Sequence, residues 1–227
     1  METKSANLEI KLDILTTKLI KDNIVEAVCK DFTYDFQDEY TFIKHSIKEH
    51  IPTGYGIGLI TGTSGTGKSL LLNDMGYEVN VEWEKDKAIC SHFNSYEEAT
   101  ERLMGAGFNS IPSWLVPFSI LSTGQKYRVN LARSIQSGSI FDEFTSVIDR
   151  GTALGLANSV QKYIREKKFT NIVFASVHKD IIPYLQADWV YNTDDKTLEI
   201  NSKIWDMSLD TKTEKVEYKH KQPFMKI

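Results

Sequence analysis

The sequence of 227 residues has few cysteines and no long hydrophobic run, and each absence excludes a class of protein. Its two cysteines, Cys29 and Cys90, form no C-x-x-C pair, so we expect buried thiols in a reducing compartment and no disulfide framework. No segment approaches the ~18 apolar residues that a membrane-spanning helix needs. The residues after Met1 lack the apolar core of a signal peptide. We therefore expect a cytoplasmic protein with no membrane segment of its own.

An excess of positive charge is also missing. The chain has 27 Lys and Arg against 31 Asp and Glu, a formal net charge of −4, which gives no global indication of nucleic-acid binding. Two local basic clusters remain, at residues 162–168 and 215–221. We interpret both as solvated surface, with a nucleic-acid-binding face as the alternative. The hydrophobic fraction of 41% suffices for a buried core.

What the chain does contain is a complete phosphate-binding motif, G-x-x-x-x-G-K-[ST]. Its residues are Gly62, Thr63, Ser64, Gly65, Thr66, Gly67, Lys68 and Ser69. The glycines let consecutive N–H groups point at phosphate oxygens, while Lys68 reaches the β- and γ-phosphates and the Ser69 hydroxyl ligates Mg²⁺. A strand-like run at 56–61 precedes the motif and a helix-like run at 69–74 follows it, which is the frame that this site requires. The sequence predicts a site for a nucleoside triphosphate and Mg²⁺.

A second group of motifs lies downstream of this phosphate loop. Its members are, in chain order, Leu121-Ser122-Thr123-Gly124-Gln125, the pair Asp142-Glu143, the residues Ser146 and Asp149, and His178. At the start of a helix, the Ser122 hydroxyl and free N–H groups can bind an anion. Asp142 ends a short apolar run, where it can hold the magnesium shell, and Glu143 beside it can act as a general base.

In these motifs and their order the chain resembles the ATP-binding-cassette (ABC) ATPase superfamily, over residues 57–191. The resemblance implies an α/β P-loop fold, with a mainly parallel sheet wrapped by helices, an N-terminal antiparallel β-layer and a short helical insert that carries the signature, residues 121–125. It implies an ATPase in which Glu143 is the base and His178 a switch near the γ-phosphate. It also implies a head-to-tail homodimer with ATP, in which Ser122, Gly124 and Gln125 contact the nucleotide bound by the opposite subunit.

We expect one nucleotide-binding domain over residues 1–227. Its parts are the antiparallel β-layer (1–56), the P-loop core (57–93 and 138–200), the helical insert (94–137) and a C-terminal tail (201–227). Strands are predicted at 8–14, 24–34, 77–83 and 88–90, with short strands at 204–207 and 216–218. A capping box of Ser95 and Glu98 opens a helix that ends at Gly105 or Gly107. The apolar run 111–118 either packs beneath the signature helix or forms a docking patch.

The sequence departs from the family pattern in several respects, and one of them is that Ser137-Gly138-Ser139 occupies normally apolar positions in the strand before Asp142. Thr123 replaces the usual first glycine of the signature. The magnesium-sensing glutamine has no clear counterpart, and the candidates to replace it are Ser91, His92 and Asn94. The candidates for the aromatic ring that stacks on adenine are Tyr34, Phe36 and Tyr40. We favour Tyr34, with core packing as the alternative for each ring.

We expect the chain to couple ATP hydrolysis to work on a nucleic acid or protein partner. Residues 141–150 and 177–180 are most similar to stand-alone cassettes of microbial and phage genomes, some of which are fused to a predicted acetyltransferase domain that is absent here. The alternatives are the energy-coupling subunit of a membrane transporter and a P-loop kinase acting on a hydroxyl acceptor. The short insert counts against transport, and the signature counts against a kinase, which needs an acceptor site and not a dimer partner.

Overall fold

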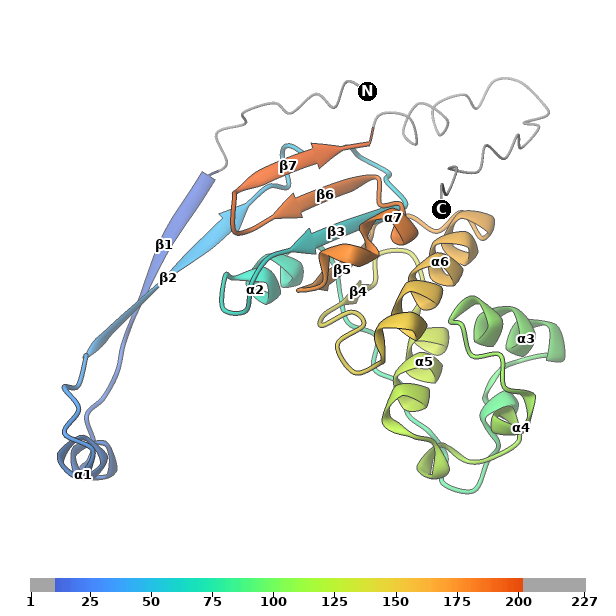
Figure 1. Ribbon diagram of the computed structural model, residues 1–227, viewed down its shortest axis with the longest axis horizontal. Helices are drawn as coiled ribbons and strands as arrows, with labels where there is room; N and C mark the ends of the chain where they lie inside the picture. Colours follow the sequence, from blue (N-terminus) through green and yellow to red (C-terminus); the bar gives the residue numbers. More distant parts are fainter. Residues whose placement is uncertain (1–10, 202–227) are drawn as a thin grey trace, which may run out of the picture.

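The computed structural model describes residues 11–201, which are built around a five-stranded sheet (Figure 1). The strand order is β4-β5-β3-β6-β7, and neighbouring strands are parallel except for the antiparallel pair β6 and β7. The strands are β3 (Ile57–Thr61), β4 (Ile140–Phe141), β5 (Ile172–Ser176), β6 (Trp189–Asn192) and β7 (Thr197–Ile200). The prediction of a mainly parallel α/β sheet is confirmed.

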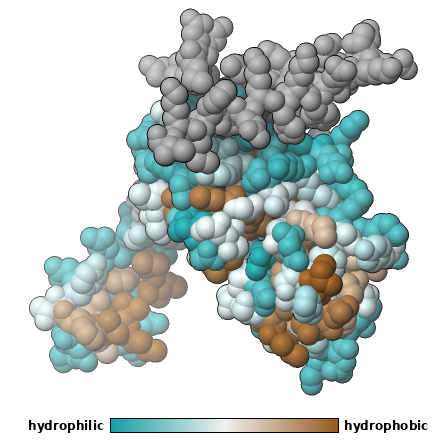
Figure 2. Space-filling view, turned by 45° about the vertical axis from the view of Figure 1, so that its right-hand side comes forward, coloured by the Kyte–Doolittle hydropathy of each residue, from teal (hydrophilic) through white to brown (hydrophobic). Residues whose placement is uncertain are grey.

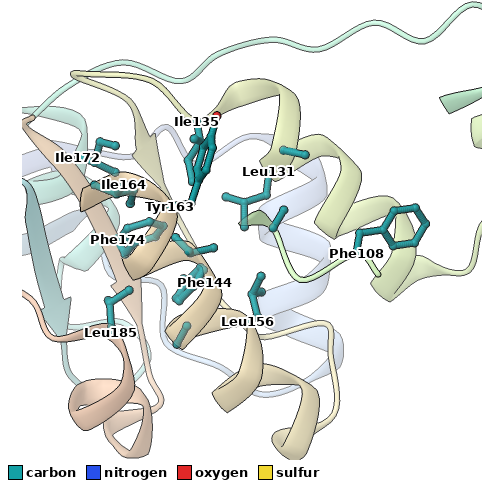
Figure 3. Close-up of a cluster of buried hydrophobic side chains, with 14 of the residues drawn as sticks. Phe108, Leu131, Ile135, Phe144, Leu156, Tyr163, Ile164, Ile172, Phe174 and Leu185 are labelled. Atoms are coloured by element: carbon teal, nitrogen blue, oxygen red, sulfur yellow. The ribbon is translucent and has the colours of Figure 1, made fainter. Parts of the chain in front are cut away.

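Both faces of this sheet are covered, because successive residues of a strand point to opposite sides. Leu59 of β3 and Phe174 of β5 lie in the larger core cluster, which they share with side chains of α5 (Thr123–Ser134) and α6 (Arg150–Glu166) (Figure 3). Their neighbours Ile60 and Ala175 belong to the second cluster, which includes residues of α2 (Lys68–Asn73). β3 and β5 are therefore buried along their whole length, as expected for central strands of a parallel sheet.

Aromatic packing holds β4, which has only two residues. The Phe174 ring stacks on Phe141 with a centroid distance of 5.1 Å and packs against Phe144 at 4.5 Å. Truncation of such a buried ring to alanine costs about 3–5 kcal/mol. The position of the acidic pair that follows Phe141 thus depends on Phe174.

The helices form two groups. Along the sheet are α2 (Lys68–Asn73), α6 (Arg150–Glu166), η3 (Lys179–Ile181) and α7 (Ile182–Leu185). η1 (Ile89–His92) directly precedes the helical insert, which contains α3 (Tyr96–Gly105), α4 (Ile111–Trp114), η2 (Phe118–Ile120) and α5 (Thr123–Ser134). Ser95 Oγ caps α3 by accepting a 3.1 Å hydrogen bond from Glu98 N, as predicted, although the Glu98 carboxylate accepts from Asn94 N and not from Ser95. No helix in residues 11–201 has the length and apolar character needed to cross a bilayer.

The N-terminal part of the described chain projects from this body as an arm, residues 11–46 (Figure 1). β1 (Lys11–Lys18) and β2 (Glu39–Ser46) form an antiparallel ribbon, with α1 (Asn23–Asp31) at its far end. Within residues 11–201, two contacts join the base of the arm to the body. Lys44 Nζ lies 2.8 Å from Asp74 Oδ2, and His45 Nδ1 lies 2.7 Å from the Tyr191 hydroxyl.

Three of the predicted strands are wrong. Most of the strand predicted at 24–34 is instead α1 (Asn23–Asp31), because Asp22 Oδ1 accepts hydrogen bonds from Ile24 N and Val25 N and so caps a helix. The strands predicted at 77–83 and 88–90 are replaced by two isolated bridges, from Tyr77 to Ser139 and from Ala88 to Pro117. The strands predicted at 204–207 and 216–218, and the start of the one predicted at 8–14, lie outside the described residues.

Candidate nucleotide-binding site

The phosphate loop joins β3 to α2, and its conformation requires glycine. Gly62, Gly65 and Gly67 have φ values of +146°, +81° and +85°. A Cβ on Gly62 would lie 2.0 Å from Thr193 Oγ1, a distance that no side chain permits. Thr66 Oγ1 lies 2.6 Å from Thr193 Oγ1 and donates to Thr63 O at 2.9 Å. The turn between β6 and β7 therefore holds the loop in its curled shape.

Lys68 folds back over this loop. Its Nζ donates a 2.5 Å hydrogen bond to Thr63 O. Burial lowers the pKa of Lys68, while the negative charges of Asp142, Asp194 and Glu143 act in the opposite direction. Three carboxylates from two segments of the chain thus act on one ammonium group, at the position where the motif requires a phosphate-binding cation.

Ser69 and Asp142 are brought together from positions 73 residues apart. Ser69 is in the first turn of α2 and Asp142 directly follows β4, and the Ser69 hydroxyl donates to Asp142 Oδ2 at 2.5 Å. Asp142 Oδ1 accepts a 2.7 Å bond from Glu143 N, which fixes the carboxylate. A hydroxyl and a carboxylate side by side are the hard oxygen ligands that suit Mg²⁺. The predicted metal residues therefore fit this ion.

Glu143 is exposed because its neighbours are anchored on either side. Phe144 is buried, its N donates to Ala175 O at 2.8 Å, and its O accepts from Ser176 Oγ at 2.9 Å. Glu143 is left to bulge outward with φ +47°, and Thr145 follows with φ +74°. The predicted general base is thus presented to solvent beside Asp142, a predicted metal ligand, and near Lys68.

His178 follows β5 and faces the same segment. Its N donates to Ser176 Oγ at 3.1 Å, and its Nδ1 lies 3.3 Å from Thr145 Oγ1. Thr145 N in turn donates to the Tyr127 hydroxyl of α5 at 3.4 Å. Thr145 therefore connects the predicted switch to the predicted base and to the signature helix. Sequence reasoning missed this residue.

Asp194 is a second residue that the sequence did not reveal. Its Oδ1 accepts from both Thr63 N and Thr63 Oγ1 at 2.9 Å, and these hydrogen bonds are the main cause of its lowered pKa. Its Oδ2 lies 3.5 Å from Lys179 Nζ, the residue after His178. Only the run of turn-forming residues at 192–195 marked this segment, and such a run carries no information about its neighbours in space.

The signature opens α5. Ser122 is the N-cap, its Oγ accepts from Gln125 N at 3.4 Å, and Gln125 Oε1 accepts from Ser122 N at 3.0 Å, a complete capping box. Thr123 is the first residue of the helix and is accommodated there. A Cβ on Gly124 would lie 3.1 Å from Ile148, so the helix start packs closely on the segment that follows Glu143. In the described part of the chain, the hydrogen bonds of Ser122 and Gln125 stay within the insert and do not reach the phosphate loop.

The structure does not bring the favoured aromatic ring to the phosphate loop of its own chain. Tyr34 follows α1 at the far end of the arm and is 68% exposed. Phe36 also lies beyond α1, and Tyr40 lies on β2 with 62% of its surface exposed.

The candidates for the magnesium sensor have local partners. His92 Nδ1 lies 2.9 Å from Ala88 O and its Nε2 accepts from Glu84 N at 3.0 Å. The ring therefore stabilises the loop at residues 84–92. The Asn94 amide donates to Glu98 at 2.8 Å. Ser91 is exposed on η1.

A glycine-rich loop between a parallel strand and a helix defines the chain as an α/β protein of the P-loop class. Within that class, its fold resembles the ABC cassette. A dimeric structure of the ATP-binding cassette MJ0796 in a post-hydrolysis state, bound to ADP and Pi, matches with a TM-score of 0.50 and 16% identity over 70% of this chain and 89% of that one. A second dimeric structure of MJ0796, described as a bacterial ABC transporter cassette, matches with a TM-score of 0.45 and 17% identity over 67% and 87% of the two chains. No family model and no curated protein sequence matches the chain.

Proposed function

We propose that the chain is an ABC-type ATPase that binds Mg²⁺ and ATP, dimerises head to tail and couples hydrolysis to work on a partner. One observation carries the proposal: the hydrogen bond between Ser69 and Asp142 places the end of the phosphate loop directly beside the exposed Glu143. The cassette MJ0796, which shares the fold, has been seen as a dimer with ADP and Pi.

Each residue has a distinct chemical task in this proposal. The loop N–H groups and Lys68 bind the β- and γ-phosphates. Ser69 and Asp142 hold Mg²⁺, which neutralises phosphate charge when bound. Glu143 orients a water and takes its proton, and His178, held by Thr145, contacts the terminal phosphate.

Dimerisation follows from the position of Ser122. Its exposed, capped helix end is suited to an anion but is not connected to the phosphate loop of its own chain. A second copy would supply the phosphate, and two-fold symmetry would complete both sites at once. We retain Tyr34, which lies on the arm, as the candidate for the ring that stacks on adenine.

Glu143→Gln tests the proposal. The variant retains the size of the side chain and the phosphate loop but cannot take a proton, so ATP with Mg²⁺ should trap a dimer. Light scattering after gel filtration measures the mass with ATP, with ADP and without nucleotide. A variant that binds ATP and remains monomeric would contradict the proposed cycle.

The nature of the partner is tested by turnover. The basic cluster at 162–168 is partly neutralised, because Arg165 pairs with Asp188 and Lys167 with Glu101. Phosphate release should be compared with and without DNA, RNA and candidate protein partners. Label moving from ATP to a hydroxyl acceptor would instead identify a kinase, and stimulation by a membrane subunit would identify a transporter component.

A further inference from the structure

The arm carries an exposed apolar surface that the proposed ATPase cycle does not use. On α1 and its end, Ile24, Val28 and Phe32 are 74%, 50% and 79% exposed and recur at intervals of four residues, so they share one side of the helix. We call these three residues the arm face. α1 buries none of its residues. Figure 2 shows the hydrophobic residues gathered at the end of the arm.

The helical insert carries a second such surface. Ile111, Leu115 and Ile120 are 48%, 67% and 69% exposed, and we call them the insert face. The predicted run 111–118 is thus divided: Trp114 is buried and donates from Nε1 to Phe108 O at 2.7 Å, whereas the insert face is open. Hydrophobic residues are also gathered on the insert in Figure 2, apart from those of the arm. Apolar clusters exposed in this way mark interaction sites.

The two surfaces lie in segments of opposite charge. Residues 18–40, the outer arm, contain six acidic and three basic side chains. Residues 106–137 of the insert contain three basic side chains and no acidic one. Their long-range attraction favours contact between the arm of one molecule and the insert of another.

Their places relative to the candidate site favour the same contact. The arm leaves the body near the phosphate loop, because His45 at its base contacts Tyr191 of β6, and β6 leads to Thr193, whose hydroxyl lies 2.6 Å from Thr66 of the loop. The insert face adjoins the signature: Ile120 is two residues from Ser122, and Ser113 of α4 accepts from Gln125 Nε2 at 3.3 Å. A copy whose Ser122 faces this phosphate loop therefore brings its insert to the side from which the arm projects. The 8 residues of β1 span about 26 Å at ~3.3 Å per residue, enough to extend past the loop.

We propose that the arm face of each copy docks on the insert face of a second copy, so that two reciprocal arm contacts close the dimer. This inference rests on the proposed head-to-tail dimer. In residues 11–201 of one chain the arm and the insert lie apart (Figure 1), so neither of the two surfaces covers the other. The arm would then add affinity that the phosphate contacts alone do not provide.

The first test measures dimer affinity in the Glu143→Gln background with ATP and Mg²⁺. The triple variant Ile24→Ser, Val28→Ser, Phe32→Ser should raise the dimer dissociation constant by about tenfold or more, as measured by analytical ultracentrifugation. Its melting temperature and its affinity for a fluorescent ATP analogue should be unchanged, because the arm face is exposed in the monomer. Tyr184→Ser, which removes a 43% exposed ring from α7, is the matched control and should leave the dimer intact.

The second test identifies the docking site directly. A photo-crosslinking amino acid at position 32 is introduced into isotopically light protein, which is mixed with heavy protein lacking the crosslinker. With ATP, mass spectrometry should find light-to-heavy crosslinks to residues 106–121. Crosslinks within one chain, or to another region of the second copy, would overturn the proposal.

The outcomes separate this inference from the proposed function. If Glu143→Gln remains monomeric with ATP, the proposed dimer is wrong and the arm contact fails with it. If Glu143→Gln dimerises and the triple variant does so equally well, only the arm contact is wrong. The arm and insert faces would in that case serve another occupant, such as a helix of a membrane subunit.

Discussion

Asp194 binds Thr63 twice through a single oxygen, accepting from its backbone N and its hydroxyl at 2.9 Å each. The same carboxylate lies 3.5 Å from Lys179, next to the predicted switch His178. The turn between β6 and β7 thus connects the start of the phosphate loop to the segment that follows β5.

Two substitutions at Asp194 separate these contacts. Asp194→Asn keeps an acceptor for Thr63 and loses the ion pair, whereas Asp194→Ala loses both. If the hydrogen bonds position the loop, Asp194→Ala should weaken ATP binding severalfold and Asp194→Asn should nearly preserve it, as measured by titration with a fluorescent ATP analogue. Equal losses in both variants would assign the effect to the charge.

The contact between Ser69 and Asp142 leads us to predict that a change at Asp142 alters the Mg²⁺ requirement of the protein. Asp142→Ala should raise the Mg²⁺ concentration needed for half-maximal phosphate release by roughly 10- to 100-fold, because groups that orient a metal site contribute about that much to metal affinity. ATP binding without Mg²⁺ should change little, since the loop and Lys68 remain. An unchanged Mg²⁺ dependence would show that Asp142 does not serve the metal.

Ser122→Arg tests whether the signature acts across an interface. The change should reduce turnover on the order of 100-fold, the typical cost of losing a donor that stabilises a developing negative charge. ATP binding by the monomer should be spared, because Ser122 is not connected to its own phosphate loop. A mixture of this variant with Lys68→Ala protein supplies the control. In a mixed dimer, one site combines the intact phosphate loop of the Ser122→Arg copy with the intact Ser122 of the Lys68→Ala copy, so the mixture should recover turnover. Full turnover by Ser122→Arg alone would contradict the interface role.

His45 predicts a pH dependence of stability. The ring is buried beside Tyr191, and burial lowers its pKa below the ordinary value of 6.5. The unfolded chain therefore takes up the proton first, so the contribution of His45 is fully present above about pH 6.5 and is lost as the pH falls through the lower, folded-state pKa. His45→Gln should shrink the difference between urea midpoints at pH 7.5 and pH 5.5. His50→Gln is the control and should retain the wild-type difference.

The local parts of the site could be predicted from the sequence because each is encoded in a few adjacent residues. The loop between β3 and α2, the cap at Ser122 and the short β4 before Asp142 all follow from motif or capping chemistry. The contacts of Thr145 and Asp194 could not be predicted, since they join segments separated by 33 and 131 residues. Such pairs become visible only when the sheet order is known.

The arm shows a different kind of failure. The helical signals were present, with Asp22 as a cap and Ile24, Val28 and Phe32 four residues apart. The strand prediction at 24–34 followed instead from the antiparallel β-layer that the family resemblance implies. Tyr77–Trp83 was also assigned to a strand, but Trp83 stacks on Phe118 at 5.2 Å and lies under Arg133 at 4.7 Å. These contacts of Trp83 with the insert join residues distant in sequence, so no local sequence pattern predicts them.

The backbone at Thr145 has a thermodynamic consequence. A buried, β-branched residue at φ +74° occupies a conformation that costs on the order of 1–3 kcal/mol, and it lies between Glu143 and His178, the proposed base and the proposed switch. The free protein therefore carries this strain at Thr145, and we expect bound nucleotide to relax it. Glycine at position 145 would remove the backbone strain, so the free protein should melt at a higher temperature. The further rise in melting temperature on adding ATP should be smaller than in the wild type.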